Sequence, residues 1–348
     1  MSTPAPIRTG IIGFGLSGRV FHAPFIATNP AFSLDLVSTG NAERAAEATA
    51  HHPGVEIVGS AEALLDRAGD LDLVILASPA HVHLEQGIAA LEAGAAVVID
   101  KPFVPSLLEA KKLIEKSEET GKMLSIFQNR RWDGDFLTLK KLITEGRLGD
   151  IHRFESTFER WGRPLTERWQ DTTTVADGAG ITFDLGSHLI DQALHLFGPA
   201  TVEAAELLNV RPGSVSDDDA FISLLHTSGV RSHLTMSRAA AQSGPRFRAL
   251  GNKGGYQVYG LDGQEPQLRD YVWPGADGYG VTPESEWGTV GIDGSLETVP
   301  TEAGNYPAFY AGVAHSILNG APAPVDPRDS LEVIRIIEHA HAMSAGSQ

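Results

Sequence analysis

The sequence predicts an α/β protein of two domains, in which a doubly wound parallel sheet precedes a mainly antiparallel sheet. Through the first third of the chain, apolar strands alternate with helical segments about every 20–25 residues. Segments after residue 150 instead alternate apolar and polar residues with period two. The 348 residues also exceed one ordinary core, since a domain typically holds about 100–200. We therefore expect domains at residues 1–125 and 126–348.

Residues 7–18 organise the first domain. An apolar strand ending at Ile12 runs directly into a G-x-G-x-x-G turn, after which a helix can begin. In this pattern the first glycine makes the tight turn, the second lets the backbone approach a pyrophosphate, and the third lets helix and strand pack closely. The helix N-terminus adds free N–H groups that favour phosphate. The turn predicts a Rossmann-type dinucleotide site formed by Gly13, Gly15, Leu16, Ser17 and Gly18; a plain glycine-rich turn is the alternative.

The remaining elements of the first domain follow in alternation. Pro24 suits the first position of a helix. The run 71–78 is almost continuously apolar, as expected of a central parallel strand buried on both faces. We expect strands at 32–38, 55–59, 71–78, 95–99 and 123–128, and helices at 42–50, 61–67, 84–92 and 105–120.

The end of the second strand bears on the choice of cofactor. A site for NAD usually offers Asp or Glu there, to hold the ribose 2′-hydroxyl. This chain has no acid at that point but offers Ser38 and Thr39, with Arg44 five residues further on. Their hydroxyls and guanidinium suit a 2′-phosphate, so NADP(H) is favoured and NAD(H) is possible. These residue types are also common in loops and helix caps, which is the ordinary alternative.

Composition excludes several classes of protein. The formal net charge of −17 disfavours nucleic acid and anionic membrane surfaces as partners. Cysteine is absent, so the chain has no disulfide, thiolate metal site or cysteine nucleophile. No apolar run approaches the ~20 residues of a membrane span. Residues 1–6 lack the basic and apolar regions of a signal peptide, and we expect a cytoplasmic protein.

Lys101 stands at the end of a predicted parallel strand, where open α/β sheets form their ligand crevice. Pro102 restricts its backbone, and the bond between the two residues can be cis. A lysine beside a nicotinamide can hydrogen-bond a substrate hydroxyl and lower its pKa. A solvated lysine is the alternative. His81 and His83 follow the neighbouring strand, beside the expected nicotinamide, although metal binding, capping or a surface position is also possible.

A second group of residues lies in the predicted helix 182–197. Asp184, His188 and Asp191 have the spacing i, i+4 and i+7, which places them on one helix face. A carboxylate that orients an imidazole and raises its basicity is what a general base near neutral pH requires. The alternatives are a buried histidine with a satisfied hydrogen bond, a capping aspartate, and a metal site. Further ligands for a metal are missing, so we expect none.

The second domain has less distinctive signals. We expect helices at 136–145, 182–197 and 328–345, strands at 151–158, 201–210, 220–226, 231–238, 247–251 and 255–259, and a glycine-rich loop at 275–295. The aspartates at 217–219 suggest a solvated turn. Aromatic and basic side chains can line a polyol pocket, although core tryptophans and surface arginines are more common. The candidates are Asn129, Arg131, Trp132, Trp161, Arg163, Arg168 and Trp169.

Together these motifs resemble the glucose-fructose oxidoreductase/inositol dehydrogenase/rhizopine-catabolism (Gfo/Idh/MocA) family over essentially the whole chain. The resemblance rests on the glycine turn, the segment Arg19-Val-Phe-His-Ala-Pro24, Ser78-Pro79 with His83, Asp100-Lys101-Pro102 in place of the usual Glu-Lys-Pro, and Asp184-x-x-x-His188. Segments 127–133 and 184–193 look most like the NADP-preferring scyllo-inositol dehydrogenase branch.

The resemblance implies a Rossmann domain followed by an α/β domain, whose large open sheet forms homodimers or homotetramers. It implies catalytic roles for Lys101, Asp184 and His188, and cofactor contacts at Ser78, Pro79, His83, Lys101 and Pro102. Lys101, Asn129, Arg131, Trp161, Asp184 and His188 are then expected to bind the substrate. Gly40 stands where NADP-dependent members often have arginine. The implied reaction is hydride transfer between nicotinamide and a cyclic polyol or sugar, with an inositol favoured. A non-catalytic NADP-responsive regulator and a reductase of another sugar-derived carbonyl are the alternatives.

Overall fold

The first domain is built on a six-stranded parallel sheet. The computed structural model describes residues 5–162, 164–166 and 169–346. The strand order β3-β2-β1-β4-β5-β6 reverses direction between β1 and β4, which is the doubly wound arrangement that places a ligand crevice at the carboxyl ends of those strands. The strands are β1 (Ile7–Ile12), β2 (Phe32–Ser38), β3 (Glu56–Val58), β4 (Leu73–Leu76), β5 (Ala96–Ile99) and β6 (Leu124–Ile126). The predicted Rossmann architecture is confirmed.

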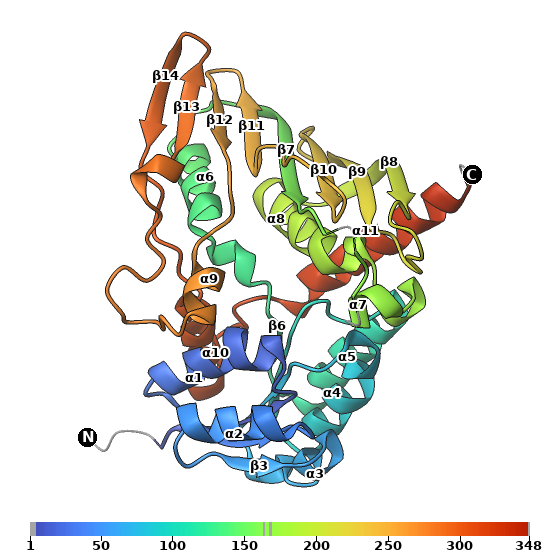
Figure 1. Ribbon diagram of the computed structural model, residues 1–348, viewed down its shortest axis with the longest axis vertical. Helices are drawn as coiled ribbons and strands as arrows, with labels where there is room; N and C mark the ends of the chain where they lie inside the picture. Colours follow the sequence, from blue (N-terminus) through green and yellow to red (C-terminus); the bar gives the residue numbers. More distant parts are fainter. Residues whose placement is uncertain (1–4, 163, 167–168, 347–348) are drawn as a thin grey trace.

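Helices cover both faces of this sheet (Figure 1). They are α1 (Ala23–Thr28), α2 (Ala42–His51), α3 (Ala61–Leu65), α4 (His83–Glu92) and α5 (Leu107–Thr120). A further helix, α10 (Pro307–Asn319), comes from the far end of the sequence and lies beside α1. Its Phe309 and Tyr310 are fully buried against Phe25 and Phe127 of the first domain. The chain therefore returns to the first domain at α10. A single domain boundary at residue 125 assigns this helix to the second domain, although it packs on the first.

The second domain is built on an eight-stranded sheet in the order β14-β13-β12-β11-β7-β10-β9-β8. All neighbouring pairs are antiparallel except β7 and β10, which run parallel. The strands are β7 (Ile151–Glu159), β8 (Ala200–Leu208), β9 (Asp219–His226), β10 (Arg231–Ser237), β11 (Phe247–Gly251), β12 (Gly255–Val258), β13 (Gly288–Ile292) and β14 (Ser295–Val299). The predicted large, mainly antiparallel sheet is confirmed.

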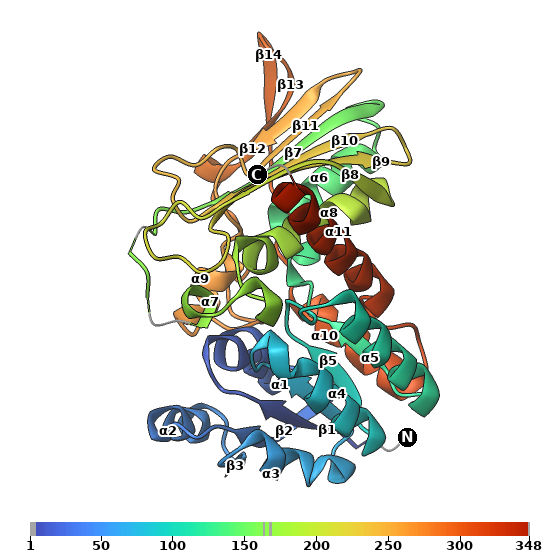
Figure 2. The same cartoon turned by 90° about the vertical axis from the view of Figure 1, so that its right-hand side faces the viewer.

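Helices pack on one face of the second sheet and leave the other face open (Figure 2). The covering helices are α6 (Gly134–Thr144), α8 (Ser187–Phe197) and α11 (Pro327–Gly346), and two short helices, α7 (Trp169–Thr172) and α9 (Gln264–Arg269), lie towards the first domain. Along β10, Ser232, Leu234 and Met236 face the helices and are fully buried, whereas His233 and Thr235 alternate with them on the open face. Among the described residues no helix is long and apolar enough to cross a membrane.

The predicted loop at 275–295 is wrong in its second half. Strand β13 begins at Gly288 and pairs with β14 across a turn at Asp293-Gly294. Asp-Gly between two short strands is a strong hairpin signal, but Gly288 and Gly291 interrupt the alternation that would have revealed the strand. The sequence analysis also assigned no helix to the positions of α9 and α10.

Two predicted helices begin as π-helical segments. Ser17–His22 precedes α1, and Thr182–Gly186 precedes α8. Both segments border the crevice between the domains. Isolated π-helical turns insert one extra residue per turn and are frequent at functional sites.

Candidate active site

A cleft of about 890 Å³ lies at the carboxyl ends of β1, β4 and β5 and is closed on its other side by the second domain. Its volume falls within the ~300–1,000 Å³ of typical ligand pockets. The predicted site residues that line it are Gly13, Gly15, Leu16, Ser17, Ser38, Thr39, Arg44, Ser78, Pro79, Lys101, Pro102, Asn129, Asp184 and His188. Four other predicted residues, Gly18, His83, Arg131 and Trp161, are not part of its lining.

The glycine turn has the geometry of a phosphate cradle. Gly13 has a φ of 90°, a backbone conformation that glycine adopts without strain. A Cβ on Gly18 would overlap the carbonyl oxygen of Gly13, so this position keeps helix and strand in close contact. A Cβ on Gly15 would instead project into the cleft, where its nearest neighbour is Arg44 Nη1 at 3.8 Å. The open space over Gly15 fits a diphosphate.

The end of β2 offers hydroxyl groups and the guanidinium of Arg44. Ser38 Oγ accepts a hydrogen bond from the Gly13 N–H at 3.3 Å, and Thr39 Oγ1 accepts one from Asn41 at 3.3 Å. Asn41 in turn caps α2 through the Arg44 N–H. The Arg44 guanidinium has no carboxylate within ion-pair distance among the described residues. It therefore remains available to an anionic ligand.

Lys101 connects the two domains across the cleft. It follows β5, and its peptide bond to Pro102 is cis, as the sequence analysis allowed. Its Nζ donates to the Asp184 carbonyl oxygen at 2.8 Å and to Asp184 Oδ1 at 3.0 Å. These contacts aim the ammonium group at the end of the cleft that the second domain closes.

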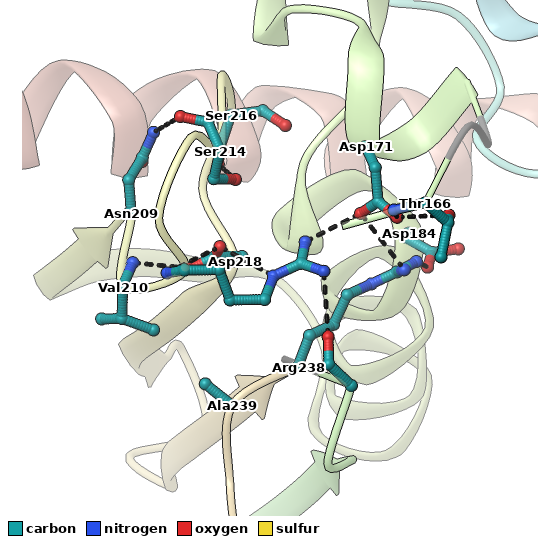
Figure 3. A network of polar contacts seen from close by, with 12 residues as sticks. Thr166, Asp171, Asp184, Asn209, Val210, Ser214, Ser216, Asp218, Arg238 and Ala239 are labelled. Atoms are coloured by element: carbon teal, nitrogen blue, oxygen red, sulfur yellow. Dashed lines mark hydrogen bonds and ion pairs between the residues drawn. The ribbon is translucent and has the colours of Figure 1, made fainter. Parts of the chain in front are cut away.

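Asp184 is held by cations on two sides. Arg238 donates to its Oδ2 and lies 3.6 Å from Asp171 Oδ1, and Asp171 is itself paired with Arg211 (Figure 3). Burial alone would raise the pKa of Asp184, but Lys101 and Arg238 outweigh it and hold the pKa far below its ordinary value. The carboxylate therefore stays ionised and fixes both of its partners.

His188 stands one helical turn beyond Asp184. Its side chain is buried, and Nδ1 has no hydrogen-bond partner. Burial, followed by the charges of Lys101 and Arg130, lowers the pKa of His188 well below its ordinary value, and Asp184 opposes this only in part. The imidazole is therefore neutral at neutral pH and can accept a proton, but its basicity is lowered, and the predicted raising of its basicity by a carboxylate is wrong.

Asp191 does not share this site, although its spacing predicted one common face. Its carboxylate binds Arg131 through two hydrogen bonds, Nε–Oδ2 at 2.8 Å and Nη2–Oδ1 at 2.6 Å. Arg131 also contacts Asp329 at 3.0 Å. The prediction that Arg131 binds substrate is thus not supported, because its guanidinium is committed to a buried structural pair. Its neighbour Arg130 lines the cleft instead.

After β7, too, the residue that lines the cleft is the one before the predicted residue. Trp161 is 59% exposed and forms an isolated bridge with Ala239, so its predicted contact with substrate is not supported. Arg160 lines the cleft in its place. Trp132 packs on Phe309, away from the cleft. The other candidates, Arg163 and Arg168, lie outside the described residues, as does the side chain of Trp169.

Two further predictions need correction. His83 is buried, and its ring nitrogens lie 2.9 Å from the carbonyl oxygens of Phe103 and Ser78, so it braces the strand ends rather than contacting a cofactor. Asp217 and Asp218 are buried as well. Asp217 accepts a hydrogen bond from the Thr182 N–H at 2.8 Å, and Asp218 pairs with Arg211. They support the π-helical entry to α8 and do not form a solvated turn.

Five further residues line the cleft although none of them was predicted as a site residue: Asp100, Arg130, Arg160, Glu265 and Arg269. Sequence reasoning also missed Arg238, which binds Asp184 directly behind the cleft. Arg238 is the last residue of a predicted strand, and the end of a strand is a position that could have marked it. Arg130 lies in the short 3₁₀ segment Asn129–Trp132, and Arg160 directly follows β7, so no periodic pattern in the sequence fixes their directions. Among the described residues, no group of three or more His, Asp or Glu side chains is placed to hold a metal ion.

The fold and this site define an oxidoreductase with a nicotinamide-dinucleotide domain. Residues 7–128 match the family described as "Oxidoreductase family, NAD-binding Rossmann fold", and residues 136–257 match the "GFO/IDH/MocA C-terminal domain". The chain belongs to the Gfo/Idh/MocA oxidoreductase family.

Similar proteins cover nearly the whole chain. The uncharacterized oxidoreductase YdgJ of Escherichia coli is 36% identical over 95% of this chain and 94% of its own length. The NADP(+)-dependent scyllo-inositol 2-dehydrogenase IolW of Bacillus subtilis is 35% identical over 96% of this chain and 92% of its own. The solved structure of the oxidoreductase yvaA from Bacillus subtilis superposes with a TM-score of 0.93, at 33% identity, covering 100% of this chain and 99% of that one.

Alanine substitutions of Gly18 and Gly15 should affect different properties, the first the stability of the fold and the second the affinity for the dinucleotide. In Gly18→Ala the new methyl group overlaps a backbone oxygen, so we expect a loss of about 1–3 kcal/mol in the free energy of unfolding. In Gly15→Ala the methyl group enters the open cleft, so stability should stay within about 0.5 kcal/mol. The dinucleotide affinity of Gly15→Ala should fall at least about tenfold. Chemical denaturation and fluorescence titration measure both effects, and unchanged affinity in Gly15→Ala would contradict the cradle.

Proposed function

We propose that the protein transfers hydride between NADP(H) and a hydroxyl-bearing carbon of a cyclic polyol or sugar, with an inositol-type ring favoured. The observation that carries this proposal is the placement of Lys101, Asp184 and His188 at one end of a cleft whose other end is the glycine cradle. The named activity of IolW supports the substrate class.

The bound nicotinamide supplies the hydride acceptor for oxidation and the donor for reduction. Lys101 Nζ donates a hydrogen bond to the substrate oxygen and stabilises negative charge as it develops there. The neutral His188 accepts the hydroxyl proton in the oxidation direction and returns it in reduction. Lys101 is the alternative base. Asp184 contacts Lys101 directly and orients its ammonium group.

Loss of the proposed proton acceptor or of the lysine should abolish turnover and spare cofactor binding. For Lys101→Ala and His188→Ala we expect turnover on a polyol panel to fall about 10²–10⁴-fold, the range of a general acid or base. The dissociation constant for NADPH should change only a few-fold. His195→Ala is a matched control, because His195 lies on the same helix and contacts Lys140 outside the cleft. Nicotinamide absorbance follows the reaction.

The pH profile of the same reaction adds a second test. Because the pKa of His188 is lowered, its neutral form persists below pH 6.5, and the acidic fall in kcat/KM for oxidation should lie below that value.

Near wild-type turnover in folded Lys101→Ala and His188→Ala proteins would contradict the mechanism. Cofactor binding without turnover on any polyol or sugar would favour the regulatory alternative.

The preference for NADP(H) rests on the end of β2. No carboxylate there competes for the ribose, Ser38 and Thr39 line the cleft, and the Arg44 guanidinium faces the space over Gly15. A guanidinium without a carboxylate partner suits a phosphate group. Gly40 departs from the arginine often found at this position in NADP-dependent members, so the proposal relies on Arg44 instead.

Removing the free arginine should therefore weaken NADPH selectively. In Arg44→Ala we expect the NADPH dissociation constant to rise about tenfold or more, because a charge-assisted hydrogen bond is lost. The NADH dissociation constant should change much less. Arg67→Ala is the control, since Arg67 pairs with Glu56 on the surface. Equal weakening of both nucleotides in fluorescence titrations would contradict the assignment of Arg44 to the 2′-phosphate.

We also propose that the protein forms a homodimer or homotetramer through the second sheet. The open face of this sheet supports the proposal, because helices bury only the opposite face. Phe221 and His233 lie side by side on adjacent strands of that face, with ring centroids 5.9 Å apart.

A further inference from the structure

The cleft carries more cations than its carboxylates neutralise. Its lining includes the basic side chains of Arg44, Lys101, Arg130, Arg160 and Arg269, against the acidic ones of Asp100, Asp184 and Glu265. This excess is local, because the whole chain has a formal net charge of −17. A positive patch in a concave site on an acidic protein concentrates anions there.

Most of these cations have partners. Lys101 binds Asp184 at 3.0 Å, and Arg269 binds Glu265 at 2.7 Å. Arg130 lies 3.2 Å from Asp133 Oδ2 and 3.3 Å from Glu265 Oε2. Only Arg44 and Arg160 of this set have no carboxylate within ion-pair distance in the described part of the chain. Arg44 lies at the dinucleotide end, over Gly15.

Arg160 lies at the opposite end of the cleft, beside the reacting groups. It directly follows β7, and Arg238 directly follows β10, the parallel neighbour of β7. The Arg160 N–H donates to the Ser237 carbonyl oxygen at 2.8 Å, which fixes its backbone beside that of Arg238. Because parallel strands present their carboxyl ends at one edge, Arg160 and the Asp184-binding Arg238 are held at the same edge of the sheet.

The guanidinium of Arg160 is positioned by an aromatic ring. It stacks on Phe158 with its carbon 4.9 Å from the ring centroid, and Arg130 lies 4.8 Å from the same centroid. The Arg160 side chain is exposed, so its guanidinium is accessible to a ligand in the cleft. Arg130 already has carboxylate partners in Asp133 and Glu265, whereas Arg160 has none among the described residues, so Arg160 is the guanidinium left for an anionic ligand.

We propose that the substrate bears an anionic group, a carboxylate or a phosphate, and that Arg160 binds it, with Arg130 beside it. This inference rests on the proposed function, since it names a substrate class for the same site. It narrows the proposed class of cyclic polyols and sugars to those that carry an acid or phosphate group, in place of the neutral inositol-type ring. A neutral polyol would leave Arg160 with hydroxyl partners only, whereas an anion forms charge-assisted hydrogen bonds, which are about twice as strong.

A binding comparison between acids and their neutral parents tests the proposal. We would titrate the NADPH-loaded protein, and the protein alone, by calorimetry with D-glucuronate, D-galacturonate and D-glucose 6-phosphate. D-glucose, D-galactose and scyllo-inositol are the neutral counterparts. At least one acid should bind tenfold or more tightly than its neutral parent, and added salt should reduce the difference. A preference for the uronates indicates a carboxylate, and a preference for the sugar phosphate indicates a phosphate.

Variants of Arg160 identify the residue responsible. Arg160→Gln should bring the acid-to-neutral ratio close to one, and Arg160→Lys should retain part of it. Arg153→Gln is the matched control, because Arg153 lies on the same strand and pairs with Glu155 outside the cleft. Acids that bind no more tightly than their neutral parents would overturn the proposal. A preference that survives Arg160→Gln would also overturn it.

The outcome can be distinguished from failure of the proposed function. Nicotinamide turnover on any member of the panel supports hydride transfer whether or not acids are preferred. Absence of NADPH binding would contradict the proposed function, whereas the acid-to-neutral ratio in the unloaded protein still decides the role of Arg160.

Discussion

The ion pair between Lys101 and Asp184 is the interaction on which the site depends. It joins side chains 83 positions apart in sequence, one at the end of a strand of the first domain and the other in the π-helical entry to α8. Arg238 holds the carboxylate from behind, and Asp171 and Arg211 extend the network into the second domain (Figure 3). Partly buried charges need such partners, because the desolvation of an unpaired charge is not offset by any attraction to an opposite charge. The same contacts that hold the domains in register therefore aim the ammonium group at the substrate.

The charged groups of the cleft form two separate sets, one at the proposed dinucleotide end and one at the proposed substrate end. The glycine cradle and the free Arg44 lie at one end, and Lys101, His188 and Arg160 at the other. The strongly negative chain cannot attract an anionic cofactor by its overall field, so these few cations and backbone N–H groups must do so locally. Burial keeps His188 neutral among the cations, which leaves it able to accept a proton where a solvated histidine would be partly charged.

Features set by local periodicity could be predicted from the sequence, and features set by turns could not. Alternating apolar runs located the parallel strands, and the glycine spacing located the phosphate cradle. By contrast, Arg130 and Arg160 face the cleft while the predicted Arg131 and Trp161 do not. Arg130 lies in a short 3₁₀ segment and Arg160 just beyond the end of β7, where no periodic pattern shows which of two neighbours faces the cleft. The π-helical turn before α8 likewise separates Asp191 from Asp184. The buried Asp217 and Asp218 depend on Thr182 and Arg211, partners distant in sequence that no local pattern reveals.

A double-mutant cycle on Lys101 and Asp184 tests the central claim most directly. The free energies of unfolding of Lys101→Met, Asp184→Asn and the double variant would be measured by chemical denaturation and compared with the unaltered protein. If the pair joins the domains as described, the losses are not additive, and the two residues show a coupling of about 0.5–3 kcal/mol. Losses that add to within about 0.3 kcal/mol would show that the two side chains act independently, and would contradict the account.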